Sequence, residues 1–221
     1  MLSAVIFDFD GIIVDSEPMH FRAFNEVLNP LDIEISWEDY CELYIGFDDR
    51  DAFREAHKLN DKKMSSRDLK RLIKNKAEIF QKYIREGDVT PLPGAVELIK
   101  SIPVRLPVAL CSGALREDIL PIIGNLGIAG CFSQIVTAED TKKSKPDPAP
   151  YQLTCEKLGI EDPATVVAIE DTPAGILSAK GAGLKVLAVT NSYDRNYLME
   201  ADAVTDSLEK VSRPQLENLI I

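Results

Sequence analysis

The sequence has few cysteines, and their spacing excludes two common ways of stabilising a small protein. The chain of 221 residues contains four, Cys41, Cys111, Cys131 and Cys155, and they include no Cys-x-x-Cys pair. This spacing matches neither a zinc site nor the disulfide framework of a small secreted domain. We therefore expect reduced thiols, as in a cytoplasmic protein.

Long hydrophobic runs are also missing. No segment approaches the roughly 18 consecutive apolar residues that a membrane-spanning helix requires. The amino terminus leads directly into an apolar segment, without the basic region and cleavage site of an export signal. The sequence thus predicts a cytoplasmic protein with no membrane partner.

Positive charge is scarce. Lysine and arginine number 25 against 36 aspartates and glutamates, which gives a net charge of −11. Such a charge repels nucleic acids, so no nucleic acid partner is expected. The segment 58–76 is an exception with eight basic and two acidic residues, and we expect most of these to lie on a solvated helix face.

Apolar residues make up 45% of the chain, which is enough to form a core. Strand and helix patterns alternate after residue 88, and this alternation predicts an α/β fold with a doubly wound parallel sheet. One strand is expected to end just before Asp8, and the others occupy residues 106–111, 134–136, 165–169, 185–189 and 203–205. The expected helices occupy residues 94–101, 116–126, 148–158 and 173–182.

The segment between the first two strands shows only helical patterns. They predict helices over residues 18–28, 37–44, 48–59 and 66–85, with breaks at Gly46 and Asn60-Asp61.

Segments 14–17 and 87–94 interrupt the helix and strand patterns on either side of this helical region, and they resemble linkers. We therefore expect an α/β core formed by residues 1–16 and 88–221. Residues 17–87 are expected to form an inserted all-helical cap, hinged so that it acts as a lid.

The first strand ends in two aspartates and a glycine, Asp8-Phe9-Asp10-Gly11. Such a segment could be an ordinary acidic turn. The apolar residues on both sides, however, place the two carboxylates in hydrophobic surroundings. Carboxylates held close together there repel each other and need a cation.

Further polar residues follow the other strands of the predicted sheet. Ser112 follows the second strand, and Glu170 and Asp171 follow the fourth. Each has an ordinary explanation, because Ser112 and Asp171 could begin helices and Glu170 could face solvent. The carboxyl ends of parallel strands meet at one edge of such a sheet, so together these residues predict a single site.

One lysine is expected to join this site. Lys142 and Lys143 belong to a basic loop and are expected to be solvated. Lys145 differs because Pro146 restricts the backbone of the residue before it, which gives the lysine side chain a better-defined direction.

Two polar residues lie on apolar helix stripes of the expected cap. Lys76 lies seven residues after Leu69, where a hydrophobic residue is expected. It could extend to solvent or point toward an anion in a cleft, and both possibilities stay open. His20 lies on or beside the stripe of its helix, where a buried structural histidine is the commoner case.

These segments together resemble the haloacid dehalogenase (HAD) superfamily over nearly the whole chain. The four motifs, in order, are Asp8-Phe9-Asp10-Gly11, Ser112-Gly113, Lys145-Pro146 and Glu170-Asp171. The helical insertion resembles the cap of the branch that contains β-phosphoglucomutase and phosphoglycolate phosphatase. Asp15-Ser16 through His20 and the loop from Gly46 to Arg50 match that branch, although β-phosphoglucomutases have their arginine one residue closer to the glycine.

The resemblance implies a Mg²⁺-dependent phosphatase that acts on a small phosphate monoester, such as a sugar phosphate. Asp8 would be the nucleophile and form an aspartyl-phosphate, and Asp10 would act as general acid and base. Asp8, the backbone carbonyl of Asp10 and Asp171 would ligate the metal, together with Glu170 directly or through water.

The resemblance also implies roles for the remaining residues. Ser112 and Gly113 would bind phosphoryl oxygens at a helix start, and Lys145 would neutralise the transferring group. The lid would present His20, Arg50 or Lys76 to the rest of the substrate. The expected partner is a small phosphorylated metabolite, and a monomer is expected.

Other functions stay open at this point. A sugar phosphomutase would return the phosphoryl group from Asp8 to the substrate instead of passing it to water, and the displaced Arg50 favours the phosphatase. A catalytically silent binding protein would require the loss of a motif carboxylate or lysine, and none is lost. A dehalogenase is disfavoured because that branch needs no metal and lacks a carboxylate at the position of Asp10.

Overall fold

The computed structural model describes residues 1–45, 47–86 and 89–221. It consists of two compact units, one formed by residues 1–15 with 90–221 and the other by residues 16–89. The predicted break at Gly46 and the start of the predicted linker at 87–88 lie outside the described residues.

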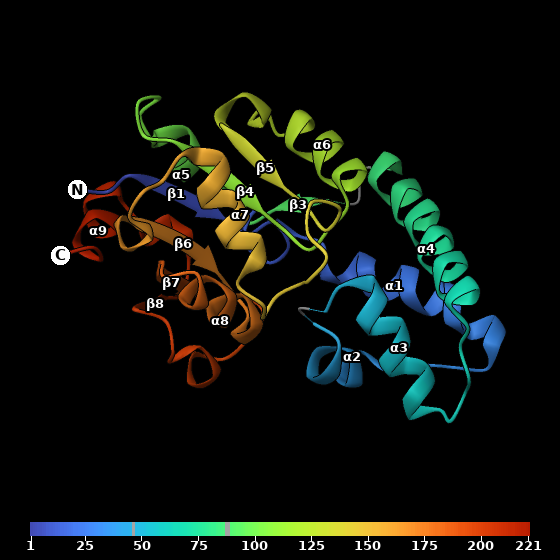
Figure 1. The fold of residues 1–221 in the computed structure, drawn as a ribbon. Coiled ribbons are helices and arrows are strands. Elements are labelled where there is room, and N and C mark those ends of the chain that lie inside the picture. The colour runs from blue at the N-terminus through green and yellow to red at the C-terminus, as the bar shows by residue number, and fades with distance from the viewer. Residues whose placement is uncertain (46, 87–88) are drawn as a thin grey trace. The chain divides into compact units, whose positions relative to one another are not determined.

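Six parallel strands form the sheet of the first unit, in the order β5-β4-β1-β6-β7-β8 (Figure 1). The strands are β1 (Ala4–Phe7), β4 (Val108–Cys111), β5 (Gln134–Val136), β6 (Val166–Glu170), β7 (Lys185–Val189) and β8 (Ala203–Thr205). Every residue of β1, β4 and β6 is buried, because helices cover both faces of the sheet and favour continuous apolar strands. This arrangement confirms the predicted fold class.

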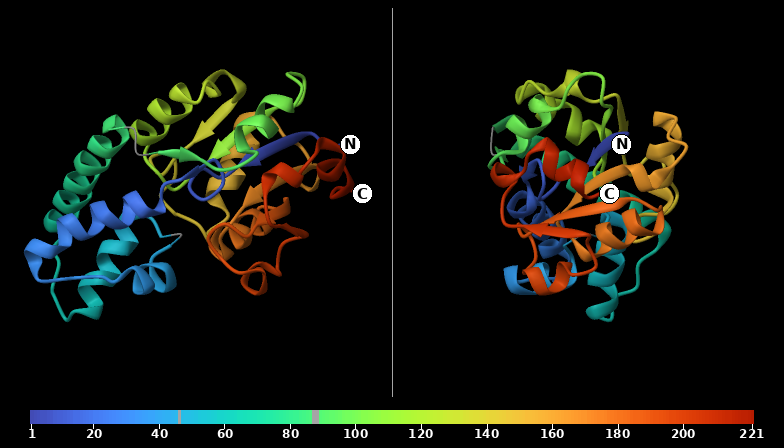
Figure 2. Two further views of the ribbon diagram at one scale, coloured as in Figure 1. Left: turned by 180° about the vertical axis from the view of Figure 1, so that it is seen from behind. Right: turned by 90° about the vertical axis from the view of Figure 1, so that its left-hand side faces the viewer.

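Helices lie on both faces of the sheet (Figure 2). On one face, α7 (Ala149–Leu158) and α8 (Pro173–Gly181) pack against the side chains that the central strands direct toward that face. On the other face lie α5 (Ala95–Ser101) and α6 (Arg116–Asn125), as right-handed crossovers toward β4 and β5 require. A short helix, α9 (Arg213–Asn218), lies near the end of the chain.

The order of the strands identifies one edge of the sheet as the expected place for a ligand. The chain passes from β1 to β4 and β5 on one side, and then crosses to β6, β7 and β8 on the other side. In open sheets of this kind, ligands bind at the carboxyl ends of the strands where the order reverses. The relevant edge is therefore formed by the ends of β1, β4 and β6.

A two-stranded antiparallel ribbon lies where the helical segment leaves and rejoins the first unit. It consists of β2 (Val14–Asp15) and β3 (Thr90–Pro91), with Asp15 opposite Thr90. The sequence did not indicate this ribbon, because strands of two residues are too short to produce an alternating pattern.

The described part of the second unit contains four α-helices: α1 (Glu17–Leu28), α2 (Trp37–Leu43), α3 (Asp49–Leu59) and α4 (Ser66–Glu86). Aromatic side chains form much of its core, and Phe24 of α1 stacks on Phe53 of α3 with ring centroids 4.4 Å apart. Asp48 caps α3 by accepting a hydrogen bond of 2.9 Å from the amide of Asp51.

Short 3₁₀ helices lie in several connections: η1 (Asn29–Leu31), η2 (Ala129–Cys131), η3 (Pro163–Thr165), η4 (Arg195–Leu198) and η5 (Leu208–Lys210). Among the described residues, none of the helices combines the length and the apolar character needed to cross a membrane.

Candidate active site

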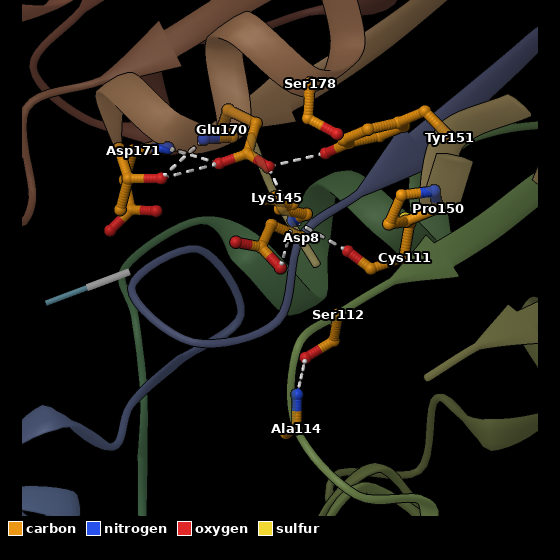
Figure 3. Close-up of polar contacts among 12 residues, drawn as sticks. Asp8, Cys111, Ser112, Ala114, Lys145, Pro150, Tyr151, Glu170, Asp171 and Ser178 are labelled. Carbon is orange, nitrogen blue, oxygen red and sulfur yellow. Dashed lines mark hydrogen bonds and ion pairs between the residues drawn. The ribbon is translucent and has the colours of Figure 1, made fainter. Parts of the chain in front are cut away.

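A buried lysine joins two carboxylates at the carboxyl edge of the sheet (Figure 3). Asp8 follows β1, and Glu170 is the last residue of β6. The Nζ atom of Lys145, from the loop before α7, lies 3.0 Å from Oδ1 of Asp8 and 2.6 Å from Oε1 of Glu170. The structure therefore brings the third motif together with the first and the fourth.

The position of Lys145 is determined by more than these ion pairs. Its Nζ atom donates to the carbonyl oxygen of Cys111 at the end of β4, over 3.0 Å. The same atom lies 5.0 Å from the ring centroid of Tyr151, within the range of a cation–π contact. The side chain is only 9% exposed, so the lysine is held inside the site and does not reach into solvent.

Glu170 is fully buried and makes hydrogen bonds through both of its oxygens. Oε1 accepts from Lys145 and from the hydroxyl of Tyr151, each over 2.6 Å. Oε2 accepts from the amide of Asp171 over 3.3 Å and from the hydroxyl of Thr172 over 3.4 Å. The simple alternative of a solvent-facing glutamate is therefore wrong.

Two glycines leave space for the carboxylates of the fourth motif. Asp171 is buried and accepts a short hydrogen bond from the hydroxyl of Ser192. A Cβ atom on Gly11, whose φ is +73°, would lie 1.9 Å from Oδ2 of Asp171. A Cβ atom on Gly175, in the first turn of α8, would lie 2.0 Å from Oε2 of Glu170. Both positions therefore require glycine, for reasons that concern the site.

The acidic side chains form a set of donors that fits a hard divalent cation. Asp8, Glu170 and Asp171 each place a carboxylate oxygen within 4.8 Å of the other two. Such oxygen donors suit Mg²⁺ better than zinc, which favours nitrogen and sulfur. Asp10 lies half-buried in the turn after β1, so the chain brings it to the same edge of the sheet.

The electrostatics of the site reflect an excess of negative charge. Burial, and the nearby carboxylate of Glu170, raise the pKa of Asp8 to about 8, although Lys145 acts in the opposite direction. Burial alone would lower the pKa of Lys145, but Asp8 and Glu170 raise it above its usual value, so the lysine stays charged. A divalent cation would relieve this excess.

The second motif lies at the end of β4, beside β1. The hydroxyl of Ser112 accepts a hydrogen bond of 2.9 Å from the amide of Ala114 and retains its proton to donate elsewhere. A Cβ atom on Gly113 would have no described atom within 4 Å. The backbone of the second motif therefore borders open space, as a seat for an anion would require.

In the second unit, Lys76 and His20 are in contact. The Nζ atom of Lys76 lies 2.6 Å from Nδ1 of His20 and 2.8 Å from Oδ1 of Asp49. His20 stacks on Phe80 with ring centroids 4.1 Å apart. The lysine side chain is 4% exposed, which excludes the alternative in which it extends to solvent.

Arg50 does not join this group. Its Nε and Nη2 atoms both donate to Oδ2 of Asp48, over 2.8 and 2.5 Å. The sequence interpretation missed Asp48 and Asp49 as partners of these cations, as it missed Tyr151 and Ser192 in the first unit. Of these contacts, the sequence could have indicated only a pairing within Asp48-Asp49-Arg50, because an arginine directly after two acidic residues can form an ion pair with one of them.

Comparison of the chain with known proteins identifies related sequences. Residues 5–189 match a family model described as haloacid dehalogenase-like hydrolase. The phosphorylated carbohydrates phosphatase of Thermotoga maritima is 31% identical over 211 residues, which cover 92% of this chain and 93% of that protein. The fructose-1-phosphate phosphatase YqaB of Escherichia coli is 28% identical over 187 residues, covering 85% and 96%.

Solved structures include proteins with a similar fold. The structure of β-phosphoglucomutase from Clostridium difficile has a TM-score of 0.89 with this chain at 24% sequence identity, covering 100% of this chain and 97% of the other. At that level of identity, the similarity shows a shared fold and nothing further.

Proposed function

The chain belongs to the haloacid dehalogenase-like hydrolase family, and on this premise we propose that it is a magnesium-dependent phosphatase of small phosphate monoesters such as sugar phosphates. One observation carries the proposal: Lys145 lies between Asp8 and Glu170, with the carboxylate of Asp171 close by. One fixed cation among three carboxylates is suited to a phosphoryl group that arrives with a divalent metal ion.

In the proposed reaction, the carboxylate of Asp8 attacks phosphorus and forms an aspartyl-phosphate, while the alcohol leaves. Asp10 gives that alcohol a proton and later takes one from the water that attacks the aspartyl-phosphate. A bound Mg²⁺ would neutralise charge on the phosphoryl oxygens. It would be held by Asp8, the carbonyl of Asp10 and Asp171, with Glu170 acting directly or through water.

The remaining residues of the first unit position the phosphoryl group. We assign to Lys145 the neutralisation of its charge, and the direct contacts of this lysine with Asp8 and Glu170 support that role. Ser112 and the amide of Gly113 would donate to the phosphoryl oxygens. Glu170 would act mainly by holding Lys145 in place, because its Oε1 atom already accepts two hydrogen bonds.

The proposal includes a lid formed by residues 17–87. The resemblance to capped members of the superfamily supports it, with residues 1–16 and 88–221 as the catalytic core. Such a lid would exclude water during transfer and present His20, Arg50 or Lys76 to the rest of the substrate. It would admit small metabolites and exclude phosphoproteins.

A mutase is the second candidate, because the same aspartyl-phosphate could be passed to another hydroxyl of the substrate. Two observations favour the phosphatase. The relatives from Thermotoga maritima and Escherichia coli are named as phosphatases, whereas the likeness to the mutase is one of fold alone. In addition, Arg50 is occupied by Asp48.

The test uses pure protein, a panel of sugar phosphates and Mg²⁺, with free phosphate and phosphosugar isomers followed separately. We expect phosphate release that EDTA and Asp8→Asn each abolish. Asp32→Asn is the matched control, because Asp32 is exposed and has a φ of +54° that asparagine accepts readily. Isomer conversion without phosphate release would show a mutase, and bound Mg²⁺ without turnover would show a silent protein.

A further inference from the structure

Lys76 and Arg50, two basic residues of the proposed lid, each pair with an acidic side chain of the same unit. We propose that Asp49 determines the substrate class: by neutralising Lys76, it selects monophosphates whose far end carries hydroxyl groups and disfavours substrates with a second phosphate. This inference rests on the proposed function, because it concerns the part of the substrate that the lid would contact.

The ammonium group of Lys76 has two polar partners, His20 and Asp49. An ammonium group has three donors and no acceptor, so the 2.6 Å contact requires Nδ1 of His20 to accept. A histidine that accepts through Nδ1 carries its ring proton on Nε2. A second donor of Lys76 is directed at Oδ1 of Asp49, 2.8 Å away. The positive charge of the cluster thus faces a carboxylate at hydrogen-bonding distance.

The charges of the wider group also cancel. Arg50 pairs with Asp48, and Lys76 pairs with Asp49. The two positive and two negative charges of these pairs cancel. A second phosphate would be attracted by Lys76 and repelled by Asp49 over similar distances, so it would gain little from entering.

A hydroxyl group suits the same cluster better than an anion does. It can accept a hydrogen bond from the third donor of Lys76 and donate one to Asp49, because a hydroxyl is both donor and acceptor. A fully ionised phosphate can only accept. Burial strengthens this preference, since the lysine side chain is 4% exposed and the aspartate 27%, so water screens the pair less than it screens the exposed pair of Lys58 and Glu55.

The experiment compares matched substrates that differ by one phosphate at the far end: glucose 1-phosphate with glucose 1,6-bisphosphate, and fructose 1-phosphate with fructose 1,6-bisphosphate. Phosphate release from either end is counted. We expect wild-type kcat/KM to be at least about tenfold higher for the monophosphate of each hydrolysed pair, because the second phosphate would lose hydration without gaining a net attraction.

Asp49→Asn tests the residue itself, because asparagine keeps an oxygen for Lys76 and removes the charge. We expect the ratio of bisphosphate to monophosphate kcat/KM to rise by at least about tenfold. Glu55→Gln is the matched control, with the same charge change on the same helix, and should leave the ratio unchanged.

The outcomes separate this inference from the proposed function. Failure of the wild-type protein to hydrolyse any monophosphate would overturn both. Hydrolysis of monophosphates and bisphosphates at equal efficiency would overturn the inference alone. The same holds if Asp49→Asn and Glu55→Gln change the ratio equally. The wild-type comparison can still overturn the inference if the Asp49 variant does not fold.

Discussion

Tyr151 connects the core to the candidate site through a single hydroxyl group. Its ring is fully buried, and its hydroxyl donates to Oε1 of Glu170 over 2.6 Å. Hydrogen bonds to charged groups contribute about 1.5–3 kcal/mol. Tyr151→Phe should therefore lower the free energy of unfolding by about 2 kcal/mol and lower kcat more than it changes KM, because Glu170 and Lys145 would be less well fixed.

Denaturant unfolding and steady-state phosphate release measure these two effects. Tyr197→Phe is the control, because Tyr197 is exposed and lies outside the site. An unchanged kcat in Tyr151→Phe would show that the hydroxyl has no positioning role.

Asp8 gives the metal-free protein a characteristic dependence on pH. Its pKa rises from 3.8 to about 8 on folding, so between these values the folded chain holds a proton that the unfolded chain has lost. The contribution of Asp8 to the free energy of unfolding therefore falls as pH rises through this window. In EDTA, Asp8→Asn should be more stable than wild type at pH 8.5 and gain little at pH 4.

Thermal unfolding at the two pH values measures this difference. Asp32→Asn, which changes an exposed aspartate, should follow wild type at both. A gain of equal size at pH 4 and pH 8.5 would show that Asp8 does not titrate in this range.

The sequence indicated that the motif residues meet at one edge of the sheet, and the structure brings Asp8, Lys145 and Glu170 into contact there. Their roles stay predictions, and the sequence did not indicate their buried partners. Asp8, Ser112, Lys145 and Glu170 could be found because each follows a strand or precedes a proline. The contact of Tyr151 with Glu170 depends on how α7 packs beside β6, and from sequence the tyrosine is indistinguishable from any core aromatic. The same applies to Asp49 and Lys76, which are 27 residues apart.

At the scale of elements, strand ends were predicted more accurately than strand starts. The second strand was expected from residue 106 and begins at Val108. Pro107 has no amide hydrogen, and it contributes its carbonyl, which accepts from the amide of Val5 over 3.1 Å. The fourth strand was expected to end at residue 169 and includes Glu170, so this site residue belongs to the sheet itself.

The start of α8 depends on a glycine. Gly175→Ala would place a Cβ atom 2.0 Å from the carboxylate of Glu170. Overpacking of this kind costs about 1–3 kcal/mol, and we expect a loss of stability in that range together with a loss of phosphate release.

Gly124→Ala in α6 is the matched control, since a Cβ atom there would have no described atom outside its own helix turn within 4 Å. Alanine is favoured over glycine in helices by roughly 0.5–1 kcal/mol, so this variant should be stabilised. Equal effects of the two substitutions in denaturant unfolding would contradict the packing argument.

At the scale of the whole molecule, the topology was predictable because the alternation of patterns after residue 88 allows few parallel arrangements. The α/β fold class is confirmed, whereas the lid of residues 17–87 stays a prediction. The ribbon of β2 and β3 was missed, since local pairing of two residues leaves no periodic signal.

That ribbon has a consequence for how such a chain can diversify. Asp15 and Thr90 lie opposite each other in one antiparallel pair, so the helical segment departs and returns at neighbouring points of the sheet unit. A two-residue turn can join strands paired in this way. The segment between them could therefore be lengthened, shortened or exchanged as one contiguous cassette while the strands, and the acids at their ends, keep their order. Under the proposed function, substrate range and reaction chemistry would thus be encoded in separable stretches of the gene.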